Sequence, residues 1–240
     1  MQVDLNALSA KDVAELYRPP LARWVRSNMV ISLDGNYAGE HGSSRELSSA
    51  GDLRVLLLLR ALSDVVVVGA RTAIGEKYAN LAIRDDLLEV ANKTPRLCVV
   101  SGSLAFSGNE GFLKDGNVRP LIITARQNEP RWVDKLSGLQ QVADVIVSDS
   151  TVTGPFIIES LRSTGHNQIL CEGGPSLLAL LAQDDCLDEM SVTLAPLVIG
   201  QTPVQPPLGH TYSMWHRTFV GVADDHTFFR FTATPLHTQV

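Results

Sequence analysis

The sequence predicts an α/β protein with three layers, in which helices cover both faces of a mixed, mostly parallel central sheet. Short apolar runs alternate with helical segments along the chain, as in parallel strands joined by crossover helices. One run, Val65–Gly69 (VVVVG), is continuously apolar, which is typical of a strand buried on both faces. The last part of the chain has strand patterns with no helix between them, so we expect antiparallel pairing at one edge.

Length and composition fit a folded globular protein. The chain has 240 residues, of which 45% are hydrophobic and 19% charged, and it contains no repeat or linker-like stretch. We divide it into an N-terminal helical extension at residues 1–22 and a single domain at residues 23–240. The net charge of −6 argues against a general nucleic-acid or anionic-membrane surface, which requires a basic face.

The first elements are a helix and a strand. Residues 4–17 predict a short helix that ends before Pro19-Pro20, because proline cannot continue a helix. Residues 23–33 mix alternating and continuous apolar positions and predict a strand, which the turn residues Asp34-Gly35 close.

A polar loop at residues 39–49 precedes a helix at residues 52–62, for which Asp52 is a suitable N-cap. Apolar residues lie nearly all round this helix, so we expect the sheet and a partner subunit to cover it. Helices are also expected at 155–162 and at 176–182, where Pro175 suits the first turn. Further strands, each a short apolar run, are expected at 65–69, 97–100, 121–124, 142–147, 168–171, 190–199 and 226–234.

The segment Leu170–Leu177 (LCEGGPSL) runs from a strand through two glycines into a helix. Gly173 and Gly174 allow a tight turn and a close ligand, and the first N–H groups of the helix carry a partial positive charge. Such a turn is either a phosphate cradle or a simple tight connection. Glu172 favours a ligand site, because it ends a buried strand at the edge where open α/β sheets bind ligands.

A second strand end carries groups that suit a phosphate. Arg71 and Thr72 follow Gly69-Ala70, and a guanidinium and a hydroxyl both donate to phosphate oxygens. Thr72 is equally suited to be the N-cap of a helix.

Arg60 lies in the leucine-rich helix, where a guanidinium either reaches solvent or meets an anionic partner. Glu76, Leu81 and Arg84 follow the second strand end, and they would place an acid and a base near it, although ordinary surface charges have the same pattern.

Motifs of several other classes are absent from the sequence. It has no G-x-G-x-x-G, P-loop, G-x-S-x-G or H-E-x-x-H, and no two of its six histidines are four residues apart, so we expect no metal site. Cys98, Cys171 and Cys186 form no C-x-x-C pair and fit reduced thiols of a cytoplasmic protein. We expect no signal peptide and no membrane span.

The order of these motifs resembles the pyrimidine reductase of riboflavin biosynthesis over residues 20 to 235. The resemblance rests on NMVISLDG at 28–35, LRA at 59–61, VGART at 68–72, EGG at 172–174 and the stretch from Asp188 to Gly200. It implies a dihydrofolate-reductase-like fold, NADPH as hydride donor, and reduction of the ribosyl group of a 5-amino-6-ribosylamino-pyrimidine phosphate to ribityl. It also implies a homodimer, for which the helix at 53–62 and the segment at 202–208 are candidate interfaces. The zinc motif of the family's deaminase half is absent.

The resemblance also assigns residues that contact the cofactor and the substrate. To the cofactor residues we add the glycines and the first helical residues that follow the two strand ends. The cofactor set is Val30, Glu46, Gly69, Ala70, Arg71, Thr72, Glu76, Ser101, Gly173, Gly174, Pro175, Ser176 and Leu177, with the helix continuing to Leu180. The substrate set is Asn28, Ser44, Arg60, Leu81, Arg84 and Glu172, with Arg60 and Arg84 on the phosphate. As candidate catalytic residues we nominate Glu76 and Glu172, the two acids able to handle a proton there.

Three positions depart from the family pattern. Asn28 stands where these reductases usually have Lys, Glu76 where they have Asp, and Glu46 where they have Trp. A neutral amide cannot supply the proton that an ammonium supplies, which leaves the acceptor open. The alternatives are NADPH-dependent reduction of dihydrofolate or another pterin-like ring, and a non-catalytic NADP-binding protein.

Overall fold

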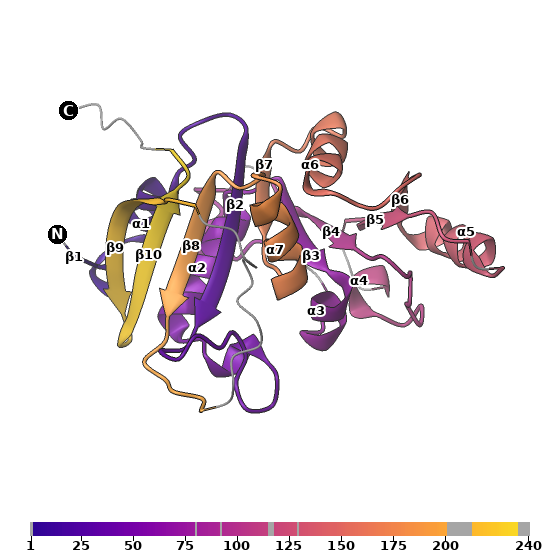
Figure 1. Cartoon of the computed structure of the whole chain (residues 1–240). Helices are drawn as coiled ribbons and strands as arrows, with labels where there is room; N and C mark the ends of the chain where they lie inside the picture. Colours follow the sequence, from indigo (N-terminus) through magenta and orange to yellow (C-terminus); the bar gives the residue numbers. More distant parts are fainter. Residues whose placement is uncertain are drawn as a thin grey trace.

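The computed structural model describes residues 2–79, 81–91, 93–114, 118–128, 130–200 and 213–234. These residues form a ten-stranded sheet in the order β1-β9-β10-β8-β2-β7-β3-β4-β5-β6, with helices on both faces (Figure 1). The strands are β1 (Gln2–Asp4), β2 (Trp24–Ile31), β3 (Val65–Gly69), β4 (Arg96–Val100), β5 (Leu121–Ala125), β6 (Asp144–Ser148), β7 (Gln168–Cys171), β8 (Glu189–Leu194), β9 (His216–Ala223) and β10 (His226–Thr232). The α-helices are α1 (Ala10–Tyr17), α2 (Ala50–Ala61), α3 (Ala70–Gly75), α4 (Gly111–Lys114), α5 (Trp132–Val142), α6 (Gly154–Ser163) and α7 (Pro175–Gln183).

The sheet is mixed and mostly parallel, as predicted. The seven strands from β8 through β2, β7, β3, β4 and β5 to β6 pair parallel with one another, and β1 pairs parallel with β9. Strand β10 pairs antiparallel with both β8 and β9, which confirms the antiparallel pairing expected from the helix-free end of the chain.

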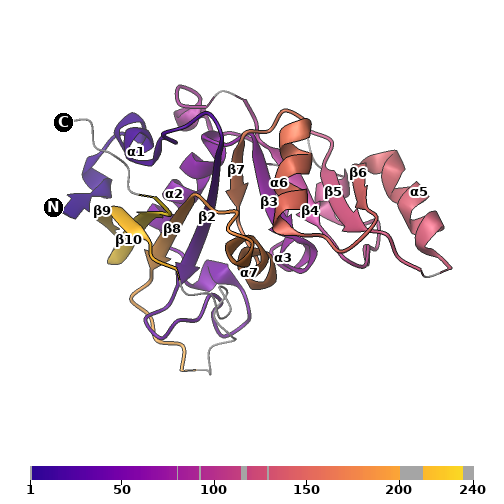
Figure 2. The ribbon, with the colours of Figure 1, turned by 45° about the horizontal axis from the view of Figure 1, so that its top comes forward.

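Alternate residues of the central strands face two separate hydrophobic cores. Val66 of β3 packs in one core with Leu59 of α2. Its neighbour Val65 packs in the other core with Leu181 of α7 and Ile157 of α6. Figures 1 and 2 show α2 and α7 on opposite sides of the sheet. The three-layer prediction is therefore confirmed.

The N-terminal segment differs from the helix predicted at 4–17. Residues 2–4 form β1 against β9, Leu5–Ala7 form a 3₁₀ turn, and α1 begins only at Ala10. The reason is local, because Ser9 and Asp12 form a reciprocal capping box that fixes the start of the helix. Val13 of α1 belongs to the same hydrophobic core as α2, so this segment packs as part of the domain.

Two predicted helix caps are wrong. Ser49 is the N-cap of α2, since its hydroxyl accepts from the N–H of Asp52 at 3.1 Å. Gly69 is the N-cap of α3, which places Thr72 inside the helix rather than at its cap.

The later elements differ from prediction at three places. Helix α5 and strand β9 were not predicted, and Val142 ends α5 instead of starting a strand. The strand expected at 190–199 stops at Leu194. Beyond it, the N–H groups of Ile199 and Gly200 donate to the Asp34 carboxylate at 3.2 and 2.8 Å, which ties this segment to the turn after β2. The Ser32 hydroxyl and these N–H groups lower the pKa of Asp34.

Candidate active site

Two glycine-containing turns meet where β3 and β7 end. The N–H of Gly69 donates to the carbonyl of Gly173 at 2.7 Å. A Cβ on Gly174 would lie 2.4 Å from the Thr72 hydroxyl, and one on Gly69 would lie 3.6 Å from the Gly174 nitrogen. Gly173 has φ +82°, a conformation that favours glycine, and its peptide bond to Gly174 is cis. At Gly174 the close contact with Thr72 therefore leaves no room for a side chain.

The N-terminus of α7 opens onto the same turn. Pro175 is its first residue, and its N-cap Gly174 has no side chain to satisfy the first N–H groups. Arg71 reaches across from α3, with its Nη2 atom 3.4 Å from the Ser176 hydroxyl. A guanidinium, hydroxyls and a positive helix end thus gather around one hollow turn, which is the chemistry of an anion cradle.

Beside the cradle, Arg60 of α2 forms a two-point ion pair with Glu172. Its Nε and Nη2 atoms donate to Oε1 and Oε2 of the carboxylate, each at 2.6 Å. Only 4% of the Glu172 side chain and 18% of the Arg60 side chain are exposed. Burial opposes the charge on Arg60, but the Glu172 carboxylate outweighs it and raises the pKa of Arg60. Arg60 therefore meets an anionic partner inside the protein and does not simply reach for solvent.

Tyr78 completes this cluster and was not predicted from the sequence. Its hydroxyl donates to Oε2 of Glu172 at 2.5 Å, and the Arg60 guanidinium lies 5.5 Å from its ring centroid. Burial, followed by the Glu172 charge, raises the pKa of Tyr78 well above its ordinary value. Tyr78 lies in the polar stretch after α3, where the sequence has no periodic pattern that could have identified it.

Glu76 holds the loop that precedes α2. Its carboxylate accepts from the Ser43 hydroxyl at 3.1 Å and from the N–H of Ser44 at 2.9 Å, and it pairs with Arg45 at 3.3 Å. Within the described part of the chain, the Glu76 carboxylate is thus bound by residues 43–45 and makes no contact with Glu172. Glu46 fixes the same loop from inside, since it pairs with Nδ1 of His41 at 3.0 Å, a contact that lowers the pKa of Glu46.

Asn28 lies beside Glu172 on the face of the sheet that α2 covers. Ser27 pairs with Cys171 in the parallel register, so the next residue on each strand, Asn28 and Glu172, are neighbours. The buried Ser191 of β8 pairs with Asn28 on its other side. The site therefore contains a neutral amide on β2.

The remaining predicted residues lie outside this cluster of charges. Arg84 is exposed and pairs with its neighbour Asp86 at 3.0 Å, while Leu81 is buried in the core. Ser101 follows β4, and its hydroxyl accepts from the N–H of Leu104 at 3.1 Å. Val30 is buried in a small cluster with Leu47 and Ala195. Ala70 begins α3, and Leu177 packs in the second core.

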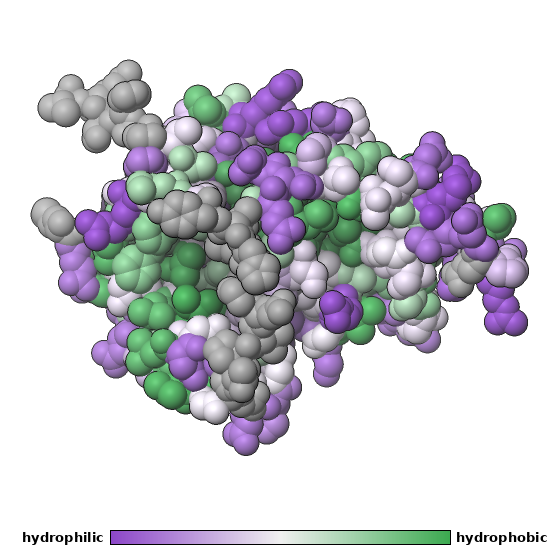
Figure 3. Space-filling view, in the orientation of Figure 1, coloured by the Kyte–Doolittle hydropathy of each residue, from purple (hydrophilic) through white to green (hydrophobic). Residues whose placement is uncertain are grey.

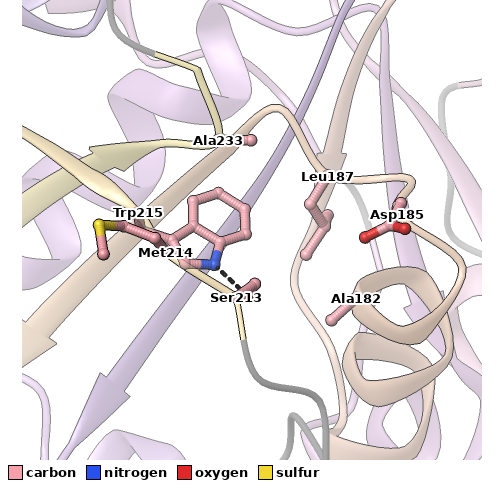
Figure 4. A pocket seen from close by; sticks show the side chains of 7 residues that line it. All are labelled: Ala182, Asp185, Leu187, Ser213, Met214, Trp215 and Ala233. Atoms are coloured by element: carbon pink, nitrogen blue, oxygen red, sulfur yellow. Dashed lines mark hydrogen bonds between the residues drawn. The ribbon is translucent and has the colours of Figure 1, made fainter.

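A hollow of about 180 Å³ lies at the far end of α7 (Figure 4). Its lining consists of Ala182, Asp185, Leu187, Ser213, Met214, Trp215 and Ala233. It contains a single charged side chain and lies beyond the end of α7 opposite to Gly174, so it is separate from the cradle.

Among the described residues there is no group of three or more His, Cys, Asp or Glu that could hold a metal ion. None of the described helices is long and apolar enough to cross a membrane.

Known proteins resemble this chain in sequence and fold. The 2,5-diamino-6-ribosylamino-4(3H)-pyrimidinone 5′-phosphate reductase of Archaeoglobus fulgidus is 27% identical over 183 residues, which cover 74% of this chain and 82% of the relative. The reductase of the same name from Methanothermobacter thermautotrophicus is 28% identical over 178 residues, covering 74% of this chain and 79% of the relative.

The solved structure of a pyrimidine reductase-like protein from Corynebacterium diphtheriae has the same fold, with a TM-score of 0.80 over 95% of this chain and 100% of that one, at 22% identity. The family model described as the RibD C-terminal domain matches residues 23–218. Because that match spans most of the sequence, the chain belongs to the RibD C-terminal domain family.

Proposed function

We propose that this protein is an NADPH-dependent reductase of riboflavin biosynthesis, which reduces the ribosyl group of a ribosylaminopyrimidine 5′-phosphate to ribityl. Family membership and the names of the two archaeal relatives support this reaction. The observation that carries it is the juxtaposition of two sites at one sheet edge. The glycine cradle of Gly69, Gly173 and Gly174 lies next to the buried pair of Arg60 and Glu172.

The cradle fits the phosphates of a dinucleotide. Its glycines let the two turns pack closely, and the positive N-terminus of α7 offers the N–H of Ser176 to an anion, since the N–H groups of Leu177 and Leu178 donate to the Gly174 carbonyl. Thr72 and Ser176 would donate hydroxyl hydrogen bonds, and Arg71 would add the positive charge that distinguishes NADPH from NADH. The bound cofactor supplies the hydride, while the protein holds the two ligands together and excludes water.

Arg60 and Glu172 would hold the substrate. Neither hydrogen bond of Arg60 to Glu172 uses Nη1, so that edge of the guanidinium is available to a phosphate. The Glu172 carboxylate would accept a hydrogen bond from a sugar hydroxyl, and Asn28 would donate one from its amide. Glu172 would be the acid beside the substrate, because it lies at the end of β7 next to the cradle, whereas Glu76 anchors the loop at 43–45.

We further propose a cytoplasmic homodimer, with the interface on the sheet instead of α2. Four apolar residues of α2 (Val55, Leu58, Leu59 and Ala61) are buried within the chain, and Leu53 is the large apolar residue of this helix that is exposed. In contrast, Val220, Val222, Phe229 and Phe231 are half-buried on the face of β9 and β10 that points away from α1. Figure 3 shows hydrophobic side chains gathered over these strands. The segment at 202–208, the other expected interface, lies outside the described residues.

Turnover with defined substrates tests the proposal. NADPH oxidation is followed with the 2,5-diamino and the 5-amino forms of the ribosylaminopyrimidine phosphate, and with dihydrofolate in parallel. We expect turnover with one of the phosphorylated pyrimidines and much weaker activity with NADH. Turnover with dihydrofolate alone would replace the substrate assignment, and NADPH binding without turnover of any acceptor would refute the reductase function.

A further inference from the structure

Tyr78 joins three segments that are distant in the sequence. It follows α3, and its hydroxyl contacts Glu172 at the end of β7 while its ring lies against Arg60 of α2. Its side chain lies within the site that we assign to the substrate, and sequence motifs do not point to it.

The hydrogen bonds around Glu172 distinguish its two oxygens. Oε2 accepts from Nη2 of Arg60 at 2.6 Å and from the Tyr78 hydroxyl at 2.5 Å. Among the residues that the structure describes, Oε1 accepts only from Nε of Arg60, at 2.6 Å. Because a carboxylate oxygen has two lone pairs, Oε2 is filled and Oε1 can accept one more hydrogen bond. Arg60 alone would bind both oxygens equally, so Tyr78 is the group that makes them different.

We propose that Tyr78 is a positioning residue of the substrate site, which fixes the Glu172 carboxylate so that Oε1 is presented to a hydroxyl or amino group of the sugar part of the substrate. The proposal rests on the reductase function given above. It extends the site by a residue that acts through Glu172 and does not itself react.

The protonation of Tyr78 agrees with a positioning role. Burial raises the pKa of Tyr78, and the Glu172 charge raises it further, so the phenol keeps its proton and remains a hydrogen-bond donor. The phenol is therefore a poor source of a proton for the reaction. Asn28, which lies on β2 beside the end of β7, brings no charge that could hold the Glu172 carboxylate in its place.

Kinetics of Tyr78→Phe test this role, because phenylalanine keeps the ring and removes only the hydroxyl. We expect kcat/KM for the ribosylaminopyrimidine phosphate to fall about tenfold to a hundredfold, the range for losing a hydrogen bond to a charged group, mainly through kcat. The Kd for NADPH should stay at the wild-type value. Tyr17→Phe is the matched control, since it removes another buried phenol hydroxyl from α1 and should leave kcat/KM unchanged.

A double-mutant cycle separates positioning from a general structural effect. If Tyr78 acts through Glu172, Tyr78→Phe combined with Glu172→Gln should be no slower than Glu172→Gln alone. Additive losses, or wild-type kinetics in Tyr78→Phe, would overturn the proposal. If the wild-type protein reduces no ribosylaminopyrimidine phosphate, both the reductase function and this role of Tyr78 are overturned. If the wild type is active and Tyr78→Phe is equally active, only the role of Tyr78 is overturned.

Discussion

Replacing Gly174 with alanine adds one methyl group at the most crowded point of the cradle. The new Cβ would lie 2.4 Å from the Thr72 hydroxyl, closer than carbon and oxygen atoms approach without displacement. Gly174 has φ −68°, which alanine adopts freely, so the substitution tests the collision and not the backbone conformation. The threonine side chain is short and lies in α3, so the turn itself must move.

The expected loss follows from the size of that displacement. Inserting a methyl group into a packed site costs about 1–3 kcal/mol, and each 1.4 kcal/mol is about a tenfold change in an equilibrium constant. If the cradle binds the cofactor, the Kd for NADPH of Gly174→Ala should rise by roughly fivefold to more than a hundredfold. Titration of tryptophan fluorescence with NADPH measures it.

Two further variants identify the cause. Gly138→Ala adds a methyl group in α5, where nothing lies within 4 Å, and should bind NADPH like the wild type. Thr72→Ala removes the colliding hydroxyl together with its own proposed bond to the cofactor, so adding Gly174→Ala to Thr72→Ala should raise the Kd for NADPH by a smaller factor than adding it to the wild type. Wild-type NADPH affinity in Gly174→Ala would refute the need for a glycine in the cradle.

Three other perturbations have defined outcomes. Arg60→Ala leaves the Glu172 carboxylate buried without its partner, so the free energy of unfolding in urea should fall by about 3–5 kcal/mol. Its affinity for the substrate should fall much more than its affinity for NADPH, and equal losses of both would contradict the assignment of Arg60 to the substrate. Glu76→Gln removes the charge that holds Ser43 and Ser44, so limited proteolysis should cut the loop at 39–49 sooner, and an unchanged cleavage rate would exclude this anchor. Burial lowers the pKa of His166 from 6.5, so its contribution to stability is complete above that pH and is lost as the pH falls below it. The drop in urea midpoint between about pH 7.5 and about pH 5.5 should therefore be smaller in His166→Gln than in the wild type, and an equal drop would exclude His166 as the cause.

The sequence predicted those helices and strands in which buried apolar residues recur in a regular pattern. Val65–Gly69 is apolar on both faces, and the structure buries it between two cores. Helix α5 escaped prediction because only Trp132 and Leu139 of its residues are buried, which leaves a weak periodic pattern. The strand order also escaped prediction, because pairing between β2 and β7 joins segments separated by most of the chain.

The candidate site was predictable in its residues but not in its contacts. Arg60 and Glu172 were both singled out from the sequence, but 112 residues separate them, and no local pattern shows that they pair. Tyr78 depends on a contact across 94 residues and gave no signal of its own. The role of Glu76 escaped in the same way, since a carboxylate nominated for proton transfer turned out to accept from loop residues 43–45.

A second buried charge cluster on the same face of the sheet differs from the pair of Arg60 and Glu172 in its contacts. Arg26 and Arg230 lie within 3.4 Å and 2.8 Å of Glu189, so the cluster has two positive charges and one negative. Both arginines also donate to carbonyls at the C-terminal end of α1, at 2.8 Å and 2.7 Å, where the helix carries a partial negative charge.

That cluster is buried and joins α1 to the sheet, while Nη1 of Arg26 and Nε of Arg230 have no hydrogen-bond partner among the described residues. The Arg60 pair differs, because Arg60 keeps 18% of its side chain exposed and Oε1 of Glu172 can still accept a hydrogen bond. Glu189→Gln should consequently lower the unfolding free energy by about 3–5 kcal/mol, since it leaves two buried arginines without their counter-charge, and the kcat of the protein that remains folded should be unchanged. Urea unfolding and kcat, measured on the same variant, distinguish the two clusters. A lower kcat in folded Glu189→Gln would show that the Glu189 cluster is not purely structural.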